Sequence, residues 1–334
     1  MKASVIVCAY NGEKYICEQL ESLRLQTRKA DEVLIFDDCS TDNSPVIIEK
    51  YIKDWGLSWT LVVNKENKGW KRNFTDGFKL ATGDVIFCCD QDDIWYPEKM
   101  DIMCCLLSKD CIKLVACKVR MCDENGNTLN RKLGAMPNSN ESGKVSNIVF
   151  DEEFYMSREP GCAIAFKREL LDIYFKFWEE YYPHDQLLWN IAKCLDGAYE
   201  IDKMLMDYRR VSSSVFESNS CKRSSVNRLS KIYQLGMVMD VICNIIEDPS
   251  ICVRNVEEKK KYVLIGKSWI KHRKKLIKDK RLFSIISLLR YIKYYKPLIV
   301  ILADCYDFLK FSQTDVCKRI HFSNTKRKRL IWKK

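Results

Sequence analysis

Several features that would place this chain in a familiar class are missing from its 334 residues. With only 12 glycines and 7 prolines, the sequence is neither collagen-like nor of low complexity. It contains no glycine-rich phosphate loop and no G-x-G-x-x-G motif, which argues against a P-loop enzyme and against a Rossmann oxidoreductase. Although there are 17 cysteines, no Cys-x-x-Cys pair or Cys/His run has the spacing of a zinc site.

Long uncharged segments are also missing. Residues 1–10 are typical of a strand and not of a signal peptide, so we expect reduced, mostly buried thiols in a cytosolic protein. The most apolar window, 283–311, is interrupted by Arg290, Lys293 and Pro297, whereas a membrane-spanning helix needs about 20 nearly uncharged residues. We therefore expect two consecutive helices with basic flanks in this window.

The composition predicts a folded protein with an uneven distribution of charge. Hydrophobic residues make up 47% of the chain and charged residues 30%, which is enough apolar material for a packed interior. The net charge is +11, but residues 271–334 hold 19 Lys and Arg against 4 Asp, or +15, which leaves −4 for the first 270 residues. The basic end suggests an anionic partner, either a membrane surface or a polyanion.

The first ninety residues alternate between strand-like and helix-like segments. Continuous apolar strands separated by helices predict an α/β fold with a mostly parallel sheet covered on both faces. Helical segments dominate beyond residue 215, so we expect two domains, 1–215 and a basic, mainly helical 216–334. The expected strands are 3–8, 32–36, 59–63 and 84–89, and the expected helices are 13–26, one beginning near 44, and 73–81.

Acidic residues follow one of the buried strands at the point where it ends. Asp90, Asp92 and Asp93 lie within four residues, and their charges repel one another at neutral pH. A bound Mg²⁺ or Mn²⁺ would neutralise them, since both ions prefer carboxylate oxygens. The alternative is a solvated acidic turn.

Two further segments carry candidate functional groups. Asp37 and Asp38 end another strand, where capping of the next helix is the alternative to a function. His184 and Asp185 follow Pro183 at the start of a predicted helix, so Asp185 is either a helix cap, a general base, or both. In open α/β sheets ligands bind at the carboxyl ends of the strands, which predicts one crevice for these groups.

Taken together, these motifs resemble family 2 glycosyltransferases of the GT-A fold. The resemblance covers about residues 1–215 and is nearest to bacterial rhamnosyltransferases and related enzymes of capsule, O-antigen and cell-wall polysaccharide assembly. It implies inverting, metal-dependent transfer of a sugar from a nucleoside-diphosphate donor to a glycan hydroxyl. The matching segments are 5–12, 37–42, 67–74, 90–95, 161–166, 184–185 and 208–209.

The resemblance also implies a role for individual residues. Asp185 would be the catalytic base, and Asp90, Asp92 and Asp93 would hold Mg²⁺ or Mn²⁺. The residues implied at the donor nucleotide are Cys8, Ala9, Tyr10, Asn11, Asp37, Asp38, Lys71, Arg72, Asn73, Asp90 and Gln91. Those implied on the acceptor side are Gly161, Cys162, His184 and Trp95, and those at the diphosphate are Arg209 and Arg210.

The sequence departs from the family pattern after Tyr208-Arg209. The resembling enzymes carry Tyr-Arg-x-His, whereas this chain has Val211 in place of the histidine, and valine cannot ligate a metal. Either Arg210 supplies the phosphate contact directly, or metal binding is weaker, or the activity is altered.

The resemblance implies a UDP- or dTDP-linked sugar donor and an acceptor that is a glycan, free or linked to polyprenyl diphosphate. The basic end would then either hold the enzyme at the inner face of the cell membrane or be simply a solvated tail. Two other functions fit the sequence less well. A nucleic-acid-binding protein would leave the acidic strand ends without a purpose, so we expect no nucleic acid partner. A sugar-phosphate nucleotidylyltransferase would carry a Gly-rich, Arg-containing loop after the first strand, and residues 9–14 are not one.

Overall fold

The computed structural model describes residues 1–129, 141–210, 225–279 and 288–295. Expectations for Val211 and for most of the window 283–311 fall outside these described residues. Contacts within the chain define two compact units. The first comprises residues 1–214 together with 241–259, and the second comprises residues 215–240 and 260–334.

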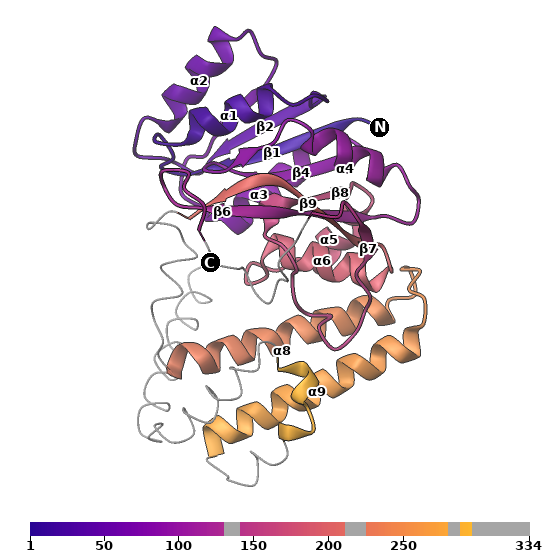
Figure 1. The fold of residues 1–334 in the computed structure, drawn as a ribbon. Helices are drawn as coiled ribbons and strands as arrows, with labels where there is room; N and C mark the ends of the chain where they lie inside the picture. Colours follow the sequence, from indigo (N-terminus) through magenta and orange to yellow (C-terminus); the bar gives the residue numbers. More distant parts are fainter. Residues whose placement is uncertain (130–140, 211–224, 280–287, 296–334) are drawn as a thin grey trace. The chain divides into compact units, whose positions relative to one another are not determined.

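The first unit contains a nine-stranded sheet with the order β3-β2-β1-β4-β8-β6-β9-β5, to which β7 is added beside β9 (Figure 1). Strands β1 to β4 are parallel to one another and correspond to the four strands expected from the sequence. The predicted α/β fold with a mostly parallel sheet is therefore confirmed. The strands are β1 (Ala3–Ala9), β2 (Glu32–Asp37), β3 (Thr60–Val63), β4 (Val85–Asp90), β5 (Ile94–Trp95), β6 (Leu114–Cys122), β7 (Val145–Asn147), β8 (Ile164–Lys167) and β9 (Ala198–Arg209).

The other half of the sheet was not anticipated from the sequence. Strand β8 runs antiparallel to both β4 and β6, whereas the long strand β9 is parallel to β6 and antiparallel to β5 and β7. Because β8 is reversed, the residues that precede it lie at the same edge as the carboxyl ends of β1, β2 and β4. This reversal brings the 3₁₀ turn η1 (Gly161–Ala163) to the edge where the acidic residues lie.

Helices cover both faces of this sheet. On one face, Val5 and Val7 of β1 share a buried cluster with Ile16 and Leu20 of α1. On the other face, Phe78 of α3 contacts side chains from β8 and α5. The result is a three-layer α/β/α unit (Figure 1). The helices are α1 (Ile16–Arg24), α2 (Ser44–Asp54) and α4 (Lys99–Leu107) on the first face, and α3 (Trp70–Leu80), α5 (Leu170–Phe177) and α6 (His184–Cys194) on the second.

The described residues of the second unit are helical, as expected for the C-terminal part of the chain. They come from α8 (Ser225–Glu247), α9 (Val256–Asp279) and the 3₁₀ turn η2 (Ile292–Tyr294). Trp269 of α9 is buried against Tyr294 and Tyr295, with ring centroids 6.0 and 5.1 Å away. Residues 229–247 of α8 are long and apolar enough to cross a membrane, but half of that stretch is buried within the protein, as in the core helix of a soluble fold.

Helix α3 lies close enough to the sheet that one position must be glycine. A Cβ on Gly77 would lie 2.4 Å from Cγ2 of Ile6 and 3.1 Å from Cε2 of Phe36, both on the underlying strands. Nothing larger than hydrogen fits there without moving the helix, and α3 begins at the carboxyl edge of the sheet.

We expect Gly77→Ala to lower the free energy of unfolding by about 1–3 kcal/mol through overpacking, although alanine is the better helix former. Urea denaturation should show a lower midpoint with an unchanged slope. Leu80→Ala on the same helix, where the side chain is 54% exposed, serves as the control and should shift stability by no more than about 0.5 kcal/mol. An unchanged midpoint for Gly77→Ala would contradict this account of the packing.

Candidate active site

The carboxyl ends of the central strands bring the sequence-predicted groups to one edge of the sheet. In the register of the parallel strands, Ala9 pairs with Asp37 on one side and Cys8 pairs with Asp90 on the other. Three of the predicted motifs therefore begin side by side.

Hydrogen bonds join the loops that follow these strands. The amide of Tyr10 donates to Oε1 of Gln91 (2.6 Å), and Nε2 of Gln91 donates to the Tyr10 carbonyl (2.9 Å). Asn11 adopts a left-handed conformation (φ 50°), and its Oδ1 accepts the amide of Thr41 (2.8 Å). A Cβ on Gly12 would lie 2.3 Å from Oε1 of Gln91, so the loop is closed against the acidic motif.

Asp37 and Asp38 are both buried, and their carboxylates accept hydrogen bonds from nearby main-chain amides and polar side chains. Asp37 accepts the amide and the hydroxyl of Ser40, as in a local turn. Asp38 accepts the amides of Lys68 (2.9 Å) and Gly69 (2.8 Å), which fixes the loop that enters α3. These bonds shape the floor of the site, while contact of either carboxylate with a nucleotide stays a prediction.

The three α3 residues predicted at the donor lie in different surroundings. Asn73 is buried and donates to the carbonyl of Phe36 (2.9 Å), which ties α3 to the sheet, while its contact with the donor stays a prediction. Nζ of Lys71 donates to the carbonyl of Tyr181 (2.9 Å). Arg72 lines a hollow of about 570 Å³ beside the start of α3.

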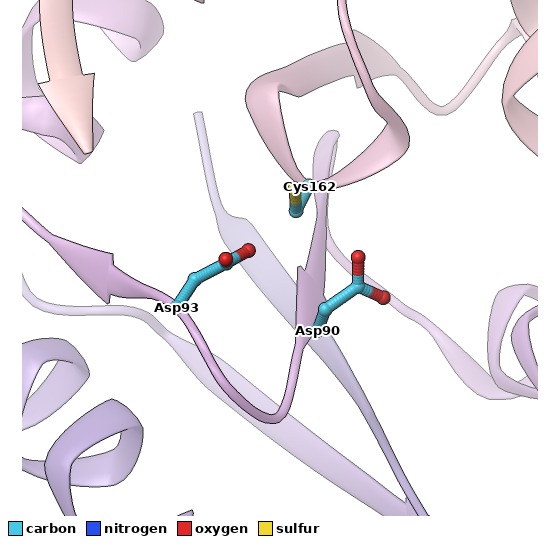
Figure 2. Close-up of side chains that lie close together, drawn as sticks. All are labelled: Asp90, Asp93 and Cys162. Atoms are coloured by element: carbon cyan, nitrogen blue, oxygen red, sulfur yellow. The ribbon is translucent and has the colours of Figure 1, made fainter. Parts of the chain in front are cut away.

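Asp90, Asp93 and Cys162 form a compact cluster, with one ligand atom from each lying within 4.8 Å of the others. Figure 2 shows the two carboxylates and the thiol converging from the end of β4, the turn that follows it, and the 3₁₀ turn η1. The family resemblance implies Asp93 as a metal ligand and Cys162 on the acceptor side. The structure brings these two residues together and leaves Asp92 outside the trio.

Burial and mutual repulsion dominate the electrostatics of the acidic motif. Burial, followed by the charge of Asp92, raises the pKa of Asp90 to about 7. Burial raises the pKa of Asp92 to about 6 against the opposing charge of Arg209. The pKa of Asp93 is also raised by burial and by its two acidic neighbours. The motif therefore favours a positive charge in its midst.

The donor set fits a hard divalent cation. Asp90 and Asp93 supply carboxylate oxygens, which Mg²⁺ and Mn²⁺ prefer. Burial raises the pKa of the Cys162 thiol well above its usual value, so the sulfur keeps its proton at neutral pH and is a poor ligand. This chemistry argues for Mg²⁺ or Mn²⁺ and against zinc.

Lys99 is a component of the site that sequence analysis missed. It is fully buried, and its Nζ donates to the Cys162 carbonyl (2.7 Å) and lies 3.2 Å from Sδ of Met206. Its charge lowers the pKa of Asp90 and so offsets part of the repulsion. The only signal in the sequence was its position four residues after Trp95.

Trp95, predicted on the acceptor side, lies in the core. Its side chain is 2% exposed and packs against Phe87, with the ring centroids 5.8 Å apart. Nζ of Lys99 lies 3.7 Å from its ring centroid. Trp95 therefore packs beside Lys99 in the core, and its contact with an acceptor stays a prediction.

Asp185 lies in the first turn of α6, whose N-cap residue is Pro183 and has no side-chain capping bond. Burial raises the pKa of Asp185, and the charge of Lys71 opposes that rise. A Cβ on Gly161 would lie 3.3 Å from Cβ of Asp185, which places this carboxyl beside the turn that carries Cys162. The predicted base and the acidic motif therefore share one neighbourhood.

His184 is held among aromatic rings. It stacks on Phe74 at 4.1 Å between ring centroids and meets the edge of Trp70 at 5.5 Å. Burial lowers its pKa to about 3, so the imidazole is neutral at physiological pH. A Cβ on Gly161 would lie 3.0 Å from its Nε2, so His184 helps to fix the turn on the predicted acceptor side.

Of the two predicted diphosphate residues, Arg209 ends strand β9 and Arg210 follows it. The amide of Arg209 donates to Oδ1 of Asp93 (3.1 Å), and its guanidinium pairs with Glu18 (2.5 Å) over the ring of Tyr15. The amide of Arg210 donates to the carbonyl of Cys122 (2.9 Å). Arg209 thus anchors the acidic turn, and the contact of either residue with a diphosphate stays a prediction.

A family model described as "Glycosyl transferase family 2" matches residues 4–175. An uncharacterized glycosyltransferase of Nostoc sp. is 27% identical over 191 residues, which are 57% of this chain and only 56% of that relative. The dTDP-rhamnosyl transferase RfbG of Shigella flexneri is 29% identical over 246 residues, covering 68% of this chain and 78% of the relative.

Solved structures show the same fold. TarS of Staphylococcus aureus, residues 1–349 with UDP-GlcNAc, gives a TM-score of 0.60 at 21% identity and covers 88% of this chain and 81% of its own. The mannosyltransferase PcManGT of Pyrobaculum calidifontis with GDP-Man and Mn²⁺ gives 0.53 at 18% identity, covering 92% of this chain and 87% of its own. These likenesses show the fold, which is that of the GT-A transferases.

The raised pKa values predict pH-dependent metal binding. In an unfolded chain the aspartates lose their protons near pH 4, whereas in the folded protein Asp90 and Asp92 keep theirs until about pH 6–7. The protonated carboxyls therefore stabilise the fold fully below about pH 4, and this stabilisation is lost as the pH rises to about 7. Binding of Mn²⁺ needs the ionised form. The rise in melting temperature on adding Mn²⁺ should therefore be small at about pH 5.5 and large at about pH 8.

Glu159→Gln is the matched control for this measurement. Glu159 is also buried and has a pKa raised by burial to about 7, but it pairs with Lys118 (3.1 Å) and is not one of the acidic-motif residues. The control should keep the Mn²⁺ effect, and Asp90→Asn should lose it. An equal Mn²⁺ effect at both pH values, or one that survives in Asp90→Asn, would disprove the assignment of the ligands.

Proposed function

Because the chain belongs to glycosyl transferase family 2, we propose that it transfers a sugar from a nucleoside-diphosphate donor to a hydroxyl of a growing glycan. The proposed transfer is metal-dependent and inverts the anomeric carbon. The observation that carries this proposal is the pairing of half-buried Asp90 and buried Asp93 beside Asp185, joined through the turn at Gly161 and Cys162.

The names of the similar proteins support the class of donor and product. One relative is a dTDP-rhamnosyl transferase, and the structural neighbours hold UDP-GlcNAc in one case and GDP-Man with Mn²⁺ in another. We propose a UDP- or dTDP-linked donor, with rhamnosyl-type transfer as one form of the activity, in the assembly of capsule, O-antigen or cell-wall polysaccharide.

The residues of the acidic motif would hold the cation and the donor together. Asp90 and Asp93 offer oxygens to Mg²⁺ or Mn²⁺, and Arg209 fixes the turn that carries Asp93. The bound cation supplies charge stabilisation to the leaving diphosphate. Lys99 holds the Cys162 carbonyl from below and thereby keeps the third side of the cluster in place.

Asp185 is proposed to remove the proton of the acceptor hydroxyl as that oxygen attacks the sugar. A pKa raised by burial makes the carboxylate a stronger base, and the charge of Lys71 opposes that rise. His184 is packed among aromatic rings and orients the start of α6. Because burial lowers its pKa to about 3, its imidazole is too weak a base to compete with Asp185 for the proton.

We place the acceptor in the hollow beside α3, which has exposed aromatic and charged groups at its rim. Trp70 is 37% exposed there and contacts His184, the residue before the proposed base. Arg72 and Glu180 form a charged edge. A glycan, free or carried on polyprenyl diphosphate, matches this mixture of aromatic and polar groups. We propose that the enzyme acts in the cytoplasm, at the inner membrane face where the acceptor is lipid-linked.

Thermal unfolding with nucleotides tests the donor site. UDP or dTDP should raise the melting temperature of the protein in the presence of Mn²⁺, and Asp90→Asn should reduce that rise because it weakens the metal contact. No shift with any nucleoside diphosphate, together with tight DNA or RNA binding that falls steeply with salt, would overturn the proposal in favour of a nucleic-acid-binding protein.

Asp185→Asn tests the base. The rate of sugar transfer, or of donor hydrolysis from a panel of nucleotide sugars, should fall by about 10²–10⁴-fold because proton removal is lost. The thermal shift with UDP or dTDP should persist. Asp172→Asn, an exposed acid in the first turn of α5, is the control and should keep the rate. Near-normal turnover of Asp185→Asn would show that another group is the base.

A further inference from the structure

The second unit contains a hollow lined by lysines that the proposed transfer does not use. A depression of about 490 Å³ lies between the parts of α8 and α9 that belong to this unit. We call it the lysine groove. Its cationic side chains are Lys267, Lys271, Lys274 and Lys275, and its acidic side chain is Asp240.

The positions of these lysines on α9 are unusual. Their spacing of four, seven and eight residues from Lys267 puts all four on one helical face, and that face is turned toward α8. Apolar residues normally occupy such a face. Asp240 of α8 pairs with Lys267 at 2.8 Å, so the groove keeps a net charge of +3.

A glycine on α8 makes room for the cations. A Cβ on Gly236 would lie 3.2 Å from Nζ of Lys274 and 3.5 Å from Cγ2 of Ile270. Because the glycine has no side chain, Lys274 can lie across the groove, with its ammonium 4.2 Å from the ring centroid of Tyr233. Partial burial lowers the pKa of Lys274, against the charge of Asp240.

Exposed apolar side chains stand beside the cations. Tyr233 is 43% exposed and Met237 39%, and both line the groove. Leu264, one turn before Lys267 on α9, is 60% exposed. A basic helix face with apolar neighbours is typical of helices that lie on a membrane surface. The described residues of the second unit carry 12 Lys and Arg against 2 Asp.

We propose that the lysine groove is a docking site for the phosphate groups of anionic lipids in a bilayer. The four lysines would contact lipid phosphates, while Tyr233 and Met237 would enter the interface beside them. Free phosphate or diphosphate has the same chemistry, but the exposed apolar side chains at the groove favour the bilayer. The inference is independent of the proposed sugar transfer, because no donor or acceptor enters its tests.

Flotation of the full chain with lipid vesicles tests the proposal. The protein should bind vesicles that contain phosphatidylglycerol and should not bind vesicles of phosphatidylcholine alone, and the binding should weaken with salt. Lys271→Gln/Lys275→Gln should reduce the partition coefficient by about 30-fold, since each basic residue near an anionic surface contributes roughly one factor of five. Both side chains are exposed, so the fold should be retained.

The matched control removes the same charge from the same helix outside the groove. Lys260→Gln/Lys261→Gln lies two turns before Lys267 and should change the partition coefficient by less than about threefold if the groove makes the contact. Equal losses in the two double variants would show that binding is a diffuse charge effect and would overturn the proposal.

Gly236→Met tests the shape of the groove without changing its charge. The new side chain would fill the space that Lys274 occupies, and methionine is a better helix former than glycine, so folding is not endangered. We expect vesicle binding to fall about tenfold or more. Unchanged binding would refute the groove. The proposal would also be overturned if the protein does not bind vesicles but shows a thermal shift with inorganic diphosphate that Lys271→Gln/Lys275→Gln abolishes.

Discussion

Burial of several carboxyl groups within one turn is the constraint on which the first unit depends. Parallel strands end at the same edge, so Asp90 is brought out of water next to its neighbouring acids, and the folded chain must offset their repulsion. It does so with buried cations placed on other elements: Lys99 at the start of α4 and Arg209 at the end of β9. The arrangement fits the proposed divalent cation, and the packing of β8, α4 and β9 holds the acidic turn in place.

The parallel half of the sheet could be predicted from the sequence because each strand is a short apolar run followed by a helix. The antiparallel half could not, since β6 and β9 are only partly buried and mix charged residues such as Lys118 and Asp207 with apolar ones. Their pairing joins residues far apart in the chain, and no local sequence pattern indicates which strands pair. Strand β8 was missed for a further reason, because its four residues are too few to show a period.

The motifs of the candidate site could be predicted from the sequence, but the positions of its individual side chains could be predicted less well. Family resemblance located the acidic motif and Asp185, and the structure brings both to one edge. Resemblance could not separate residues that face the site from those that support it, and the burial of Trp95 and Asn73 was not evident from their motifs. Lys99 was not predicted because a lysine in a helix is usually solvated, and only the tertiary packing shows that the Lys99 side chain is buried.

The closeness of Gly161 to α6 has a consequence for anyone who wishes to re-engineer the enzyme. Because a Cβ at this position would lie 3.0 Å from Nε2 of His184 and 3.3 Å from Cβ of Asp185, a substitution in this turn would have to displace these side chains slightly. Combinatorial libraries should leave it untouched and should vary the solvent-facing rim formed by Arg72 and Glu180, where new side chains have room and the scaffold beneath them is undisturbed.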